Sequence, residues 1–403
     1  MTLPRLKTAQ KWAAVVVGAG FILWAAVLGV WSYQKNIHLW FPAYITWTAG
    51  HAGKAEASPG PIHILFMVAD HFEPGRDTSR AREWAARFRA IALNHRDADG
   101  RPPRHTWFYP IEQRRDDVLE VLADLVRDGL GEIEVHFHHR ISSSDAYRAA
   151  LRSGVRDFQR FGASITEDGR TAFGYAAGNW ALDNALAPQF PGVNDEITIL
   201  REEGAFADFT FPAYESRAQP RVINSLYYAT DDPQRPKSYY TGVPVRVGSP
   251  PPPGGFLMVE GPLLVNWLDW RHRYYPAVEY GGLTGENPPL PHRIEAWIRA
   301  GISVEGRPGW IVVKAFTHGA SPADMPTIVG PPREQMHSYL EAKYNDGKRY
   351  VLHYVTAREL YNIVKAAEAG LAGNPDRYRN FLIRPYRNSG LPKAARAAAV
   401  TSP

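Results

Sequence analysis

The sequence predicts an α/β fold with a parallel (β/α) barrel, whole or incomplete, preceded by one N-terminal transmembrane helix. Strand-like and helix-like stretches alternate from about residue 62, which is typical of parallel α/β folds. About seven or eight strand-like stretches favour a barrel over an open sheet. A run without a charge at 12–33 indicates the transmembrane helix.

Residues 12–33 are long enough to cross a bilayer core of about 30 Å as a helix. Arg5, Lys7 and Lys11 precede this run. Only Lys35 follows it closely, so the positive-inside rule puts the N-terminus in the cytoplasm. A cleaved signal peptide is the alternative, but its apolar core is usually about 7–15 residues. We expect a single-pass anchor with the following domain outside the cytoplasm, in the periplasm or at the cell surface.

The order of segments follows from the anchor and from composition. The segment after the anchor is aromatic-rich but contains Lys35, His38 and Pro42, so we expect it at the membrane surface. We expect a cytoplasmic N-terminus at 1–11, the anchor at 12–33, a membrane-proximal segment and linker at 34–61, the barrel domain at 62–387 and a disordered tail at 388–403.

The elements of the barrel domain follow from apolar runs and their breaks. We expect strands at 63–70, 105–110, 132–139, 172–180, 207–213, 256–266, 310–318 and 350–356. We expect helices at 78–94, 111–128, 143–161, 290–300, 334–343 and 357–370. Ser142–Ser144 predict an N-cap for the third helix. The Pro- and Gly-rich stretch 215–255 is expected to be irregular.

Composition excludes several classes of function. The net charge of +5 is spread along the chain without a Lys/Arg block, so nucleic-acid binding is disfavoured. There is no phosphate-binding G-x-x-x-x-G-K-[ST] loop and no G-x-S-x-G motif, which disfavours nucleotide binding and serine hydrolase chemistry. Cysteine is absent, so any metal must be bound by His, Asp, Glu or water.

Polar side chains collect where the expected strands end, which is where active sites lie in such barrels. Asp70 and Glu73 follow the first strand, and a VHFHHR stretch ends the third. Asn179, Trp180 and Asp183 at the fourth strand, with Lys314 at the seventh, are candidates for substrate binding. The other candidates are His136, His138 and His139 for metal binding, Asp70 for metal binding and catalysis, and Glu73 and His318 for catalysis.

Strand parity orients the histidines. Side chains alternate between the two faces of a strand, so Glu134, His136 and His138 share the face that points into the barrel. His139 lies on the opposite parity at the strand end. Two histidines at i and i+2 with Asp70 form a His₂Asp metal site with an open position, and Glu134 is a candidate to fix an imidazole tautomer. The alternative is a set of buried, hydrogen-bonded histidines.

Parity also orients the later residues. His318 shares the parity of Lys314 and is expected to point inward. His353 is more typical of core packing. Asp183 has the alternative of starting a helix, and Glu73 that of capping a helix or pairing with Arg76.

A strand-end Asp, a histidine cluster two strands later and a late His resemble the NodB-type polysaccharide deacetylases of the glycoside hydrolase/deacetylase superfamily. The resemblance implies a distorted (β/α) barrel of about seven strands, with Asp70, His136 and His138 or His139 as metal ligands. It implies His318 as general acid. His71 stands where the family has a second Asp, and the spacing is H-x-H-H instead of H-x-x-x-H, so Glu73 is the substitute base.

The implied function is metal-dependent removal of N- or O-acetyl groups from a polysaccharide or other glycan, with Zn²⁺ as the expected ion. Asp70 or Glu73 takes the proton of water, and His318 protonates the leaving group. A glycoside hydrolase of the same superfamily, using carboxylates among Glu73, Asp183 and Glu260, is the first alternative. A membrane-anchored glycan-binding or assembly protein with a degenerate site is the second.

Overall fold

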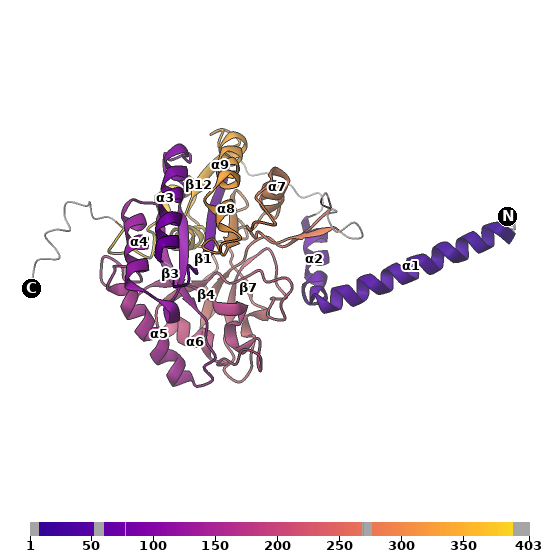
Figure 1. The fold of residues 1–403 in the computed structure, drawn as a ribbon, viewed down its shortest axis with the longest axis horizontal. Helices are drawn as coiled ribbons and strands as arrows, with labels where there is room; N and C mark the ends of the chain where they lie inside the picture. Colours follow the sequence, from indigo (N-terminus) through magenta and orange to yellow (C-terminus); the bar gives the residue numbers. More distant parts are fainter. Residues whose placement is uncertain (1–7, 52–59, 77, 268, 270–275, 390–403) are drawn as a thin grey trace, which may run out of the picture.

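The computed structural model describes residues 8–51, 60–76, 78–267, 269 and 276–389. It is a mixed α/β structure in which a ten-stranded, mostly parallel sheet carries helices on both faces, and one long N-terminal helix projects away from the domain (Figure 1). The α/β class expected from the alternating pattern is confirmed.

The sheet has the order β11-β1-β2-β3-β4-β5-β8-β6-β7, and β12 pairs with the first half of β1. Each pair from β11 to β8 is parallel, and β6 is antiparallel to both β8 and β7. No ladder joins the two ends of this path within the described part of the chain, so a closed seven-stranded barrel is not seen. The strands of this sheet are β1 (Ile62–His71), β2 (His105–Pro110), β3 (Gly131–Phe137), β4 (Phe173–Ala177), β5 (Ala205–Asp208), β6 (Leu226–Thr230), β7 (Val243–Pro244), β8 (Gly255–Val259), β11 (Trp310–Thr317) and β12 (Tyr350–Tyr354).

Two apolar cores lie on the two faces of the sheet. In β1, Phe66 and Val68 pack in the core that includes helices α3, α4 and α5, whereas Leu65 and Met67 pack in the core that includes α2 and α10. Ser143 caps α5 by accepting a hydrogen bond from the Ala146 N–H, as its sequence predicts. The helices are α1 (Thr8–Gln34), α2 (Ile37–His51), α3 (Thr78–Asn94), α4 (Asp116–Arg127), α5 (Ser144–Gln159), α6 (Glu196–Glu202), α7 (Pro291–Arg299), α8 (Met325–Ile328), α9 (Pro331–Tyr344) and α10 (Ala357–Glu368).

The stretch 215–255 differs most from the sequence expectation, because it contains β6 and β7. The strand expected at 256–266 is broken into β8 and β9 (Leu264–Asn266), and β9 forms a separate hairpin with β10 (Ala277–Glu279). The break lies at Gly261 and Pro262. The Gly261 N–H donates to the Phe211 carbonyl, and Pro262 has no N–H to continue a ladder.

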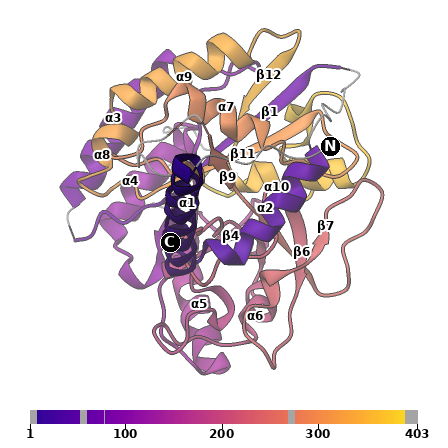
Figure 2. The same cartoon turned by 90° about the vertical axis from the view of Figure 1, so that its right-hand side faces the viewer.

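Helix α1 is long and apolar enough to cross a membrane between Gln10 and Gln34, and its most apolar stretch has no buried residue. Helix α2 follows at a steep angle and packs on the domain (Figure 1 and Figure 2). Trp40 of α2 is fully buried, and its indole N–H donates to the Tyr214 carbonyl at 3.1 Å. The expected linker therefore begins after α2, and residues 52–59 lie outside the described residues.

The end of the described chain packs against β3 and the segment that follows α5. The Tyr386 hydroxyl donates to Glu134, and the Asn388 side-chain amide donates to the Phe161 carbonyl at 3.0 Å. Asn388 is 6% exposed, so the tail expected from this residue begins later. Residues 390–403, which make up most of that predicted tail, lie outside the described residues.

Candidate metal centre

Glu73, His136 and His138 form one group at the carboxyl ends of the strands, which we call the metal group. Glu73 follows the end of β1 by two residues, His136 lies in β3 and His138 just after it. The parity prediction for β3 is confirmed, because Ile133 and Val135 pack in the core against the helices. His136 and His138 lie on the other face.

The spacing within the metal group fits a tetrahedral ion. The Glu73 Oε1 atom is 3.3 Å from His136 Nε2 and 3.4 Å from His138 Nε2. Two ligand atoms of a tetrahedral site with bonds of about 2.0–2.1 Å are about 3.3–3.4 Å apart. All three ligand atoms lie within 4.8 Å of one another. The group can therefore offer three ligands to one Zn²⁺ and leave a fourth position open.

Hydrogen bonds outside the metal group fix both imidazole rings. His136 Nδ1–H donates to the Ala176 carbonyl at 2.7 Å. His138 Nδ1–H donates to the Glu112 carboxylate at 2.8 Å. Each bond holds the proton on Nδ1 and turns the Nε2 lone pair toward Glu73, which is the tautomer that a metal ligand needs.

Two of the three ligand atoms in the metal group lack hydrogen-bond partners. Glu73 Oε1 and His136 Nε2 are buried and have no hydrogen-bond partner of acceptable geometry. Burial favours the neutral acid, but the imidazoles of His136, His138 and His318 outweigh it and lower the pKa of Glu73. The carboxylate is therefore ionised near neutral pH. Buried polar atoms without partners are uncommon in proteins, and a bound ion is one way in which such atoms become satisfied.

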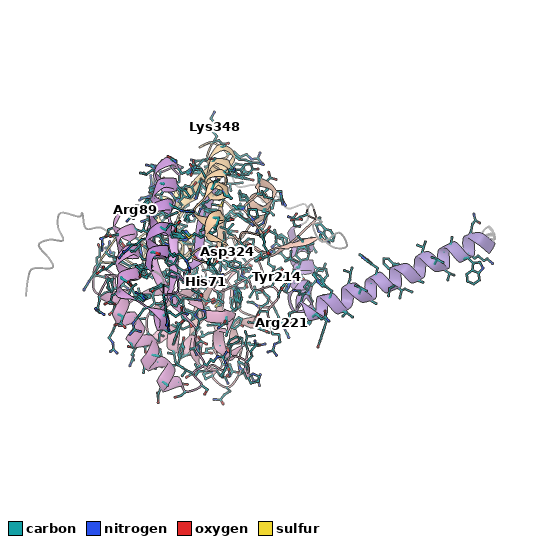
Figure 3. The ribbon with its side chains drawn as sticks, viewed as in Figure 1. His71, Arg89, Tyr214, Arg221, Asp324 and Lys348 are labelled. Carbon is teal, nitrogen blue, oxygen red and sulfur yellow. The ribbon has the colours of Figure 1, made fainter. Side chains whose placement is uncertain are left out.

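Two further histidines continue the cluster. The ring centroid of His71 lies 4.5 Å from that of His136 and 5.0 Å from that of His318. His71 lies inside the domain (Figure 3), and its buried Nε2 atom has no hydrogen-bond partner. Burial, reinforced by nearby histidines and Lys314, holds the pKa of His71 well below its ordinary value. Burial also lowers the pKa of His318, so both rings are neutral near pH 7.

A cavity of about 600 Å³ is lined by His318, and Glu73, His136 and His138 are not among its lining residues. Asn179 and Trp180, which the sequence suggests as substrate-binding residues, also line it. Both have left-handed backbone conformations, with φ of 55°. Tyr214 and Tyr280 add aromatic surface. The cavity can hold a small polar molecule with an apolar face, such as a sugar.

The structure does not bring Asp70, which the sequence suggests as a metal ligand, into the metal group. Asp70 Oδ1 accepts the Gly319 N–H at 2.7 Å, and Oδ2 lies 2.9 Å from His105 Nε2. Burial raises the pKa of Asp70 to about 7. Its parity in β1 is that of Val68, which faces the helices, so His71 and not Asp70 turns toward His136. Asp70 instead supports the loop that carries His318.

His139 also lies outside the metal group. Its Nε2 atom is 3.4 Å from Glu196 Oε1, and its ring packs 4.6 Å from that of Tyr147. Glu134 does not fix a histidine tautomer either. Its carboxylate accepts the Gly174 N–H at 2.6 Å and the Tyr386 hydroxyl at 2.9 Å. The sequence analysis had placed His139 on the opposite parity from His136, and it is the roles of these two residues that the structure does not support.

The other two predicted substrate contacts do not line the cavity. Asp183 is fully buried, where its carboxylate accepts the Ser238 N–H at 2.6 Å and burial raises its pKa to about 8. Lys314 is buried and donates to the carbonyls of Phe209, at 2.5 Å, and Phe211. Burial lowers the pKa of Lys314 to about 7. Both residues are structural in this arrangement.

Sequence reasoning missed His71 and Glu112 as parts of the site. Parity applied to β1 would have found His71, because it continues the alternation of Leu65, Met67 and Ala69. Glu112 lies in a short 3₁₀ turn, Ile111–Gln113, where the sequence predicts the start of a helix. No pattern in the sequence marks it.

A second group of similar chemistry, Asp97, Asp99 and His353, has ligand atoms within the same 4.8 Å limit, and we call it the bonded group. The Asp97 carboxylate accepts the N–H groups of Asp99, Arg101 and Tyr354. His353 is bonded through Nδ1 to Asp99 at 2.6 Å and through Nε2 to His63 at 2.8 Å. These bonds occupy the atoms that an ion would need.

No family model matches the chain, and no curated protein matches it in sequence.

Proposed function

We propose that this protein is a membrane-anchored, metal-dependent hydrolase that removes N- or O-acetyl groups from a polysaccharide or other glycan. The observation that carries the proposal is the metal group, with two tautomer-fixed imidazoles and an ionised carboxylate, in which Glu73 Oε1 and His136 Nε2 lack hydrogen-bond partners. The aromatic cavity lined by His318 supports a sugar as the substrate.

In this proposal Glu73, His136 and His138 hold a divalent ion, with Zn²⁺ favoured by the ligand types and spacing. Such an ion supplies polarisation of the acyl carbonyl and acidification of water. Glu73 is thus a ligand and not the base that the sequence suggested.

His318 is the residue proposed to move the proton. It lies on the cavity wall, and burial keeps it neutral, so its imidazole can accept a proton from the attacking water. The same ring then donates that proton to the leaving amine or alcohol. Asp70 is proposed as a positioning residue, because it holds the Gly319 N–H beside His318.

The proposal includes a barrel-like curvature of the sheet, as in the polysaccharide deacetylases. The run β11-β1-β2-β3-β4-β5-β8 contains seven consecutive parallel strands. Lys314 on β11 donates to the carbonyls of Phe209 and Phe211, which follow β5. A side chain that joins distant strands of the run in this way supports a strongly curved sheet.

The proposed location is outside the cytoplasm, with α1 as a single-pass anchor. Helix α1 has the required length and hydropathy. Arg5, Lys7 and Lys11 on its N-terminal side support a cytoplasmic N-terminus.

The glycoside hydrolase alternative gains no support from the carboxylates assigned to it. Asp183 and Glu260 are buried and do not line the cavity. Burial raises the pKa of Glu260 well above its usual range, so it is not an available nucleophile.

The test is metal analysis of the full chain purified in detergent, followed by acetate release from acetylated oligosaccharides. We expect one divalent ion per chain and acetate release that requires it. His136→Ala should lose both, and His353→Ala in the bonded group should keep the metal. A chain that binds no divalent ion, or a His136→Ala variant that retains it, would contradict the proposal. Stoichiometric metal without acetate release would favour the glycan-binding alternative.

A further inference from the structure

The cavity beside the histidine cluster extends to the end of the membrane helix. Asn36, the residue between α1 and α2, lines the same cavity as His318. The Asn36 side-chain amide donates to the Glu215 carbonyl at 2.7 Å, and Lys35 forms an ion pair with the Glu215 carboxylate at 2.8 Å. The two residues that connect α1 to α2 are therefore bonded to Glu215, which lines the cavity.

The surface around this end of the cavity suits a bilayer interface. Helix α2 runs at a steep angle to α1, so it lies along the membrane surface if α1 crosses the membrane (Figure 1). Phe41 and Ile45 of α2 are 40% and 53% exposed. Trp267, the residue that follows β9, is 62% exposed. Exposed aromatic and aliphatic side chains of this kind are typical of the interface between lipid and water.

A cluster of three cations, which we call the cationic cluster, adjoins the same end of the cavity. Arg217 lines the cavity, and Lys237 Nζ donates to the Arg217 carbonyl at 3.0 Å. Arg221 and Lys237 both lie over the Tyr240 ring, 5.7 Å and 4.9 Å from its centroid. Within the described residues, no carboxylate forms an ion pair with any of the three.

We propose that the substrate is a saccharide joined through a phosphate to a lipid of the bilayer that holds α1. This inference rests on the proposed function. The saccharide enters the cavity from the Asn36 side and reaches His318, and the cationic cluster binds the phosphate. Arginine and lysine without carboxylate partners are suited to phosphate, and the lipid chain stays in the bilayer beside α1.

The experiment uses the full chain, loaded with Zn²⁺, in phosphatidylcholine vesicles. Three forms of one acetylated disaccharide are compared: the free sugar, its 1-phosphate, and the 1-phosphate linked to a polyisoprenyl chain in the same vesicles. We expect kcat/KM to be highest for the lipid-linked form, by at least about tenfold over the free sugar. Equal values for the three forms would overturn the inference and leave the proposed function standing.

The double variant Arg217→Gln/Arg221→Gln tests the phosphate contact. We expect it to reduce the preference for phosphate-bearing forms over the free sugar by about tenfold. Lys348→Ala, an exposed cation far from α2 (Figure 3), is the control and should keep the preference. A reduction that occurs only when anionic phosphatidylglycerol is added to the vesicles would mean that the cations bind bilayer lipid, and would overturn the phosphate assignment.

If none of the three sugar forms is hydrolysed, a binding measurement still tests whether the protein binds a lipid-linked sugar phosphate, independently of the deacetylase proposal. Native mass spectrometry of the full chain in detergent counts bound lipid-linked sugar phosphate without turnover. Weaker binding by the double variant than by Lys348→Ala would support the inference even if the deacetylase proposal fails. Equal binding by the two variants would overturn it.

Discussion

The metal group and the bonded group use the same side-chain chemistry but differ in what surrounds each ligand atom. In the bonded group, backbone N–H groups and Arg379 donate hydrogen bonds to the Asp97 carboxylate. The His353 imidazole is hydrogen-bonded to His63. In the metal group, the hydrogen bonds go to the far side of each ring, and Glu73 Oε1 and His136 Nε2 have no partner. Both groups therefore bring potential metal ligands close together, but only the metal group contains ligand atoms that lack a hydrogen-bond partner. The difference also predicts opposite responses to mutation.

The largest effect should come from matched neutral substitutions in the two groups. Asp97→Asn should lower the free energy of unfolding by about 1–3 kcal/mol, because its amide N–H group would face a backbone N–H that now donates to the carboxylate. Its metal content should not change. Glu73→Gln should abolish metal binding with little effect on the stability of the metal-free chain. Denaturant titration and metal analysis measure both, and metal loss in Asp97→Asn would remove the distinction between the groups.

A cavity-side glycine offers the next test. Gly178 packs so closely on His138 that an added Cβ would lie 2.5 Å from its ring and 2.6 Å from its Cα. Gly178→Ala should displace His138, weaken metal binding, and lower the free energy of unfolding by about 1–3 kcal/mol through overpacking. Gly60→Ala is the matched control, because nothing lies within 4 Å of the added methyl. Unchanged metal affinity in Gly178→Ala would contradict the assigned role of His138.

Substitution of Glu112, the carboxylate that orients His138, should have a smaller effect. Glu112→Gln keeps an acceptor for His138 Nδ1–H but removes its charge, so metal affinity should fall about 10–100-fold. Glu120→Gln, exposed on α4, is the control. Competition with a metal-binding dye measures both. An affinity equal to that of the unmodified chain would mean that Glu112 does not support the ligand.

Asp183 is only half hydrogen-bonded, so it is intermediate between the two groups. One of its carboxylate oxygens accepts the Ser238 N–H, and the other has no hydrogen-bond partner. Its pKa rises from 3.8 to about 8 on folding, so the folded state binds the proton more tightly. Stability from this group is present below about pH 4 and is lost as the pH rises to about 8. Asp183→Asn should make the fall in unfolding free energy over this range shallower, by at most about 1.4 kcal/mol per pH unit. An unchanged slope in Asp183→Asn would contradict this role of the buried carboxyl group.

The sequence predicts the fold class and many of its elements because the alternating apolar runs depend on burial alone. Helix α3 and strand β2 have the bounds that their patterns predict. The strands β6 and β7 were missed because they pair antiparallel within a Pro- and Gly-rich stretch. Their pairing depends on partners that no local pattern reveals.

For the site, parity located His136 and His138 correctly because it depends only on strand geometry. Asp70 was assigned because it ends the first strand as an aspartate does in the polysaccharide deacetylases, although parity in β1 favours His71. Glu112 and Gly178 act through contacts between segments that are distant in the chain, and such contacts are not encoded in spacing.

The bond between Tyr386 and Glu134 has a consequence for the time course of synthesis. Its two partners are 252 residues apart in the chain. At about 5–20 residues per second, roughly 13–50 s pass between the synthesis of Glu134 and that of Tyr386. During that interval the carboxylate lacks the hydroxyl that it bonds in the folded domain, so β3 cannot reach its final packing. A nascent chain that pauses before Tyr386 should therefore stay sensitive to proteases and dependent on chaperones.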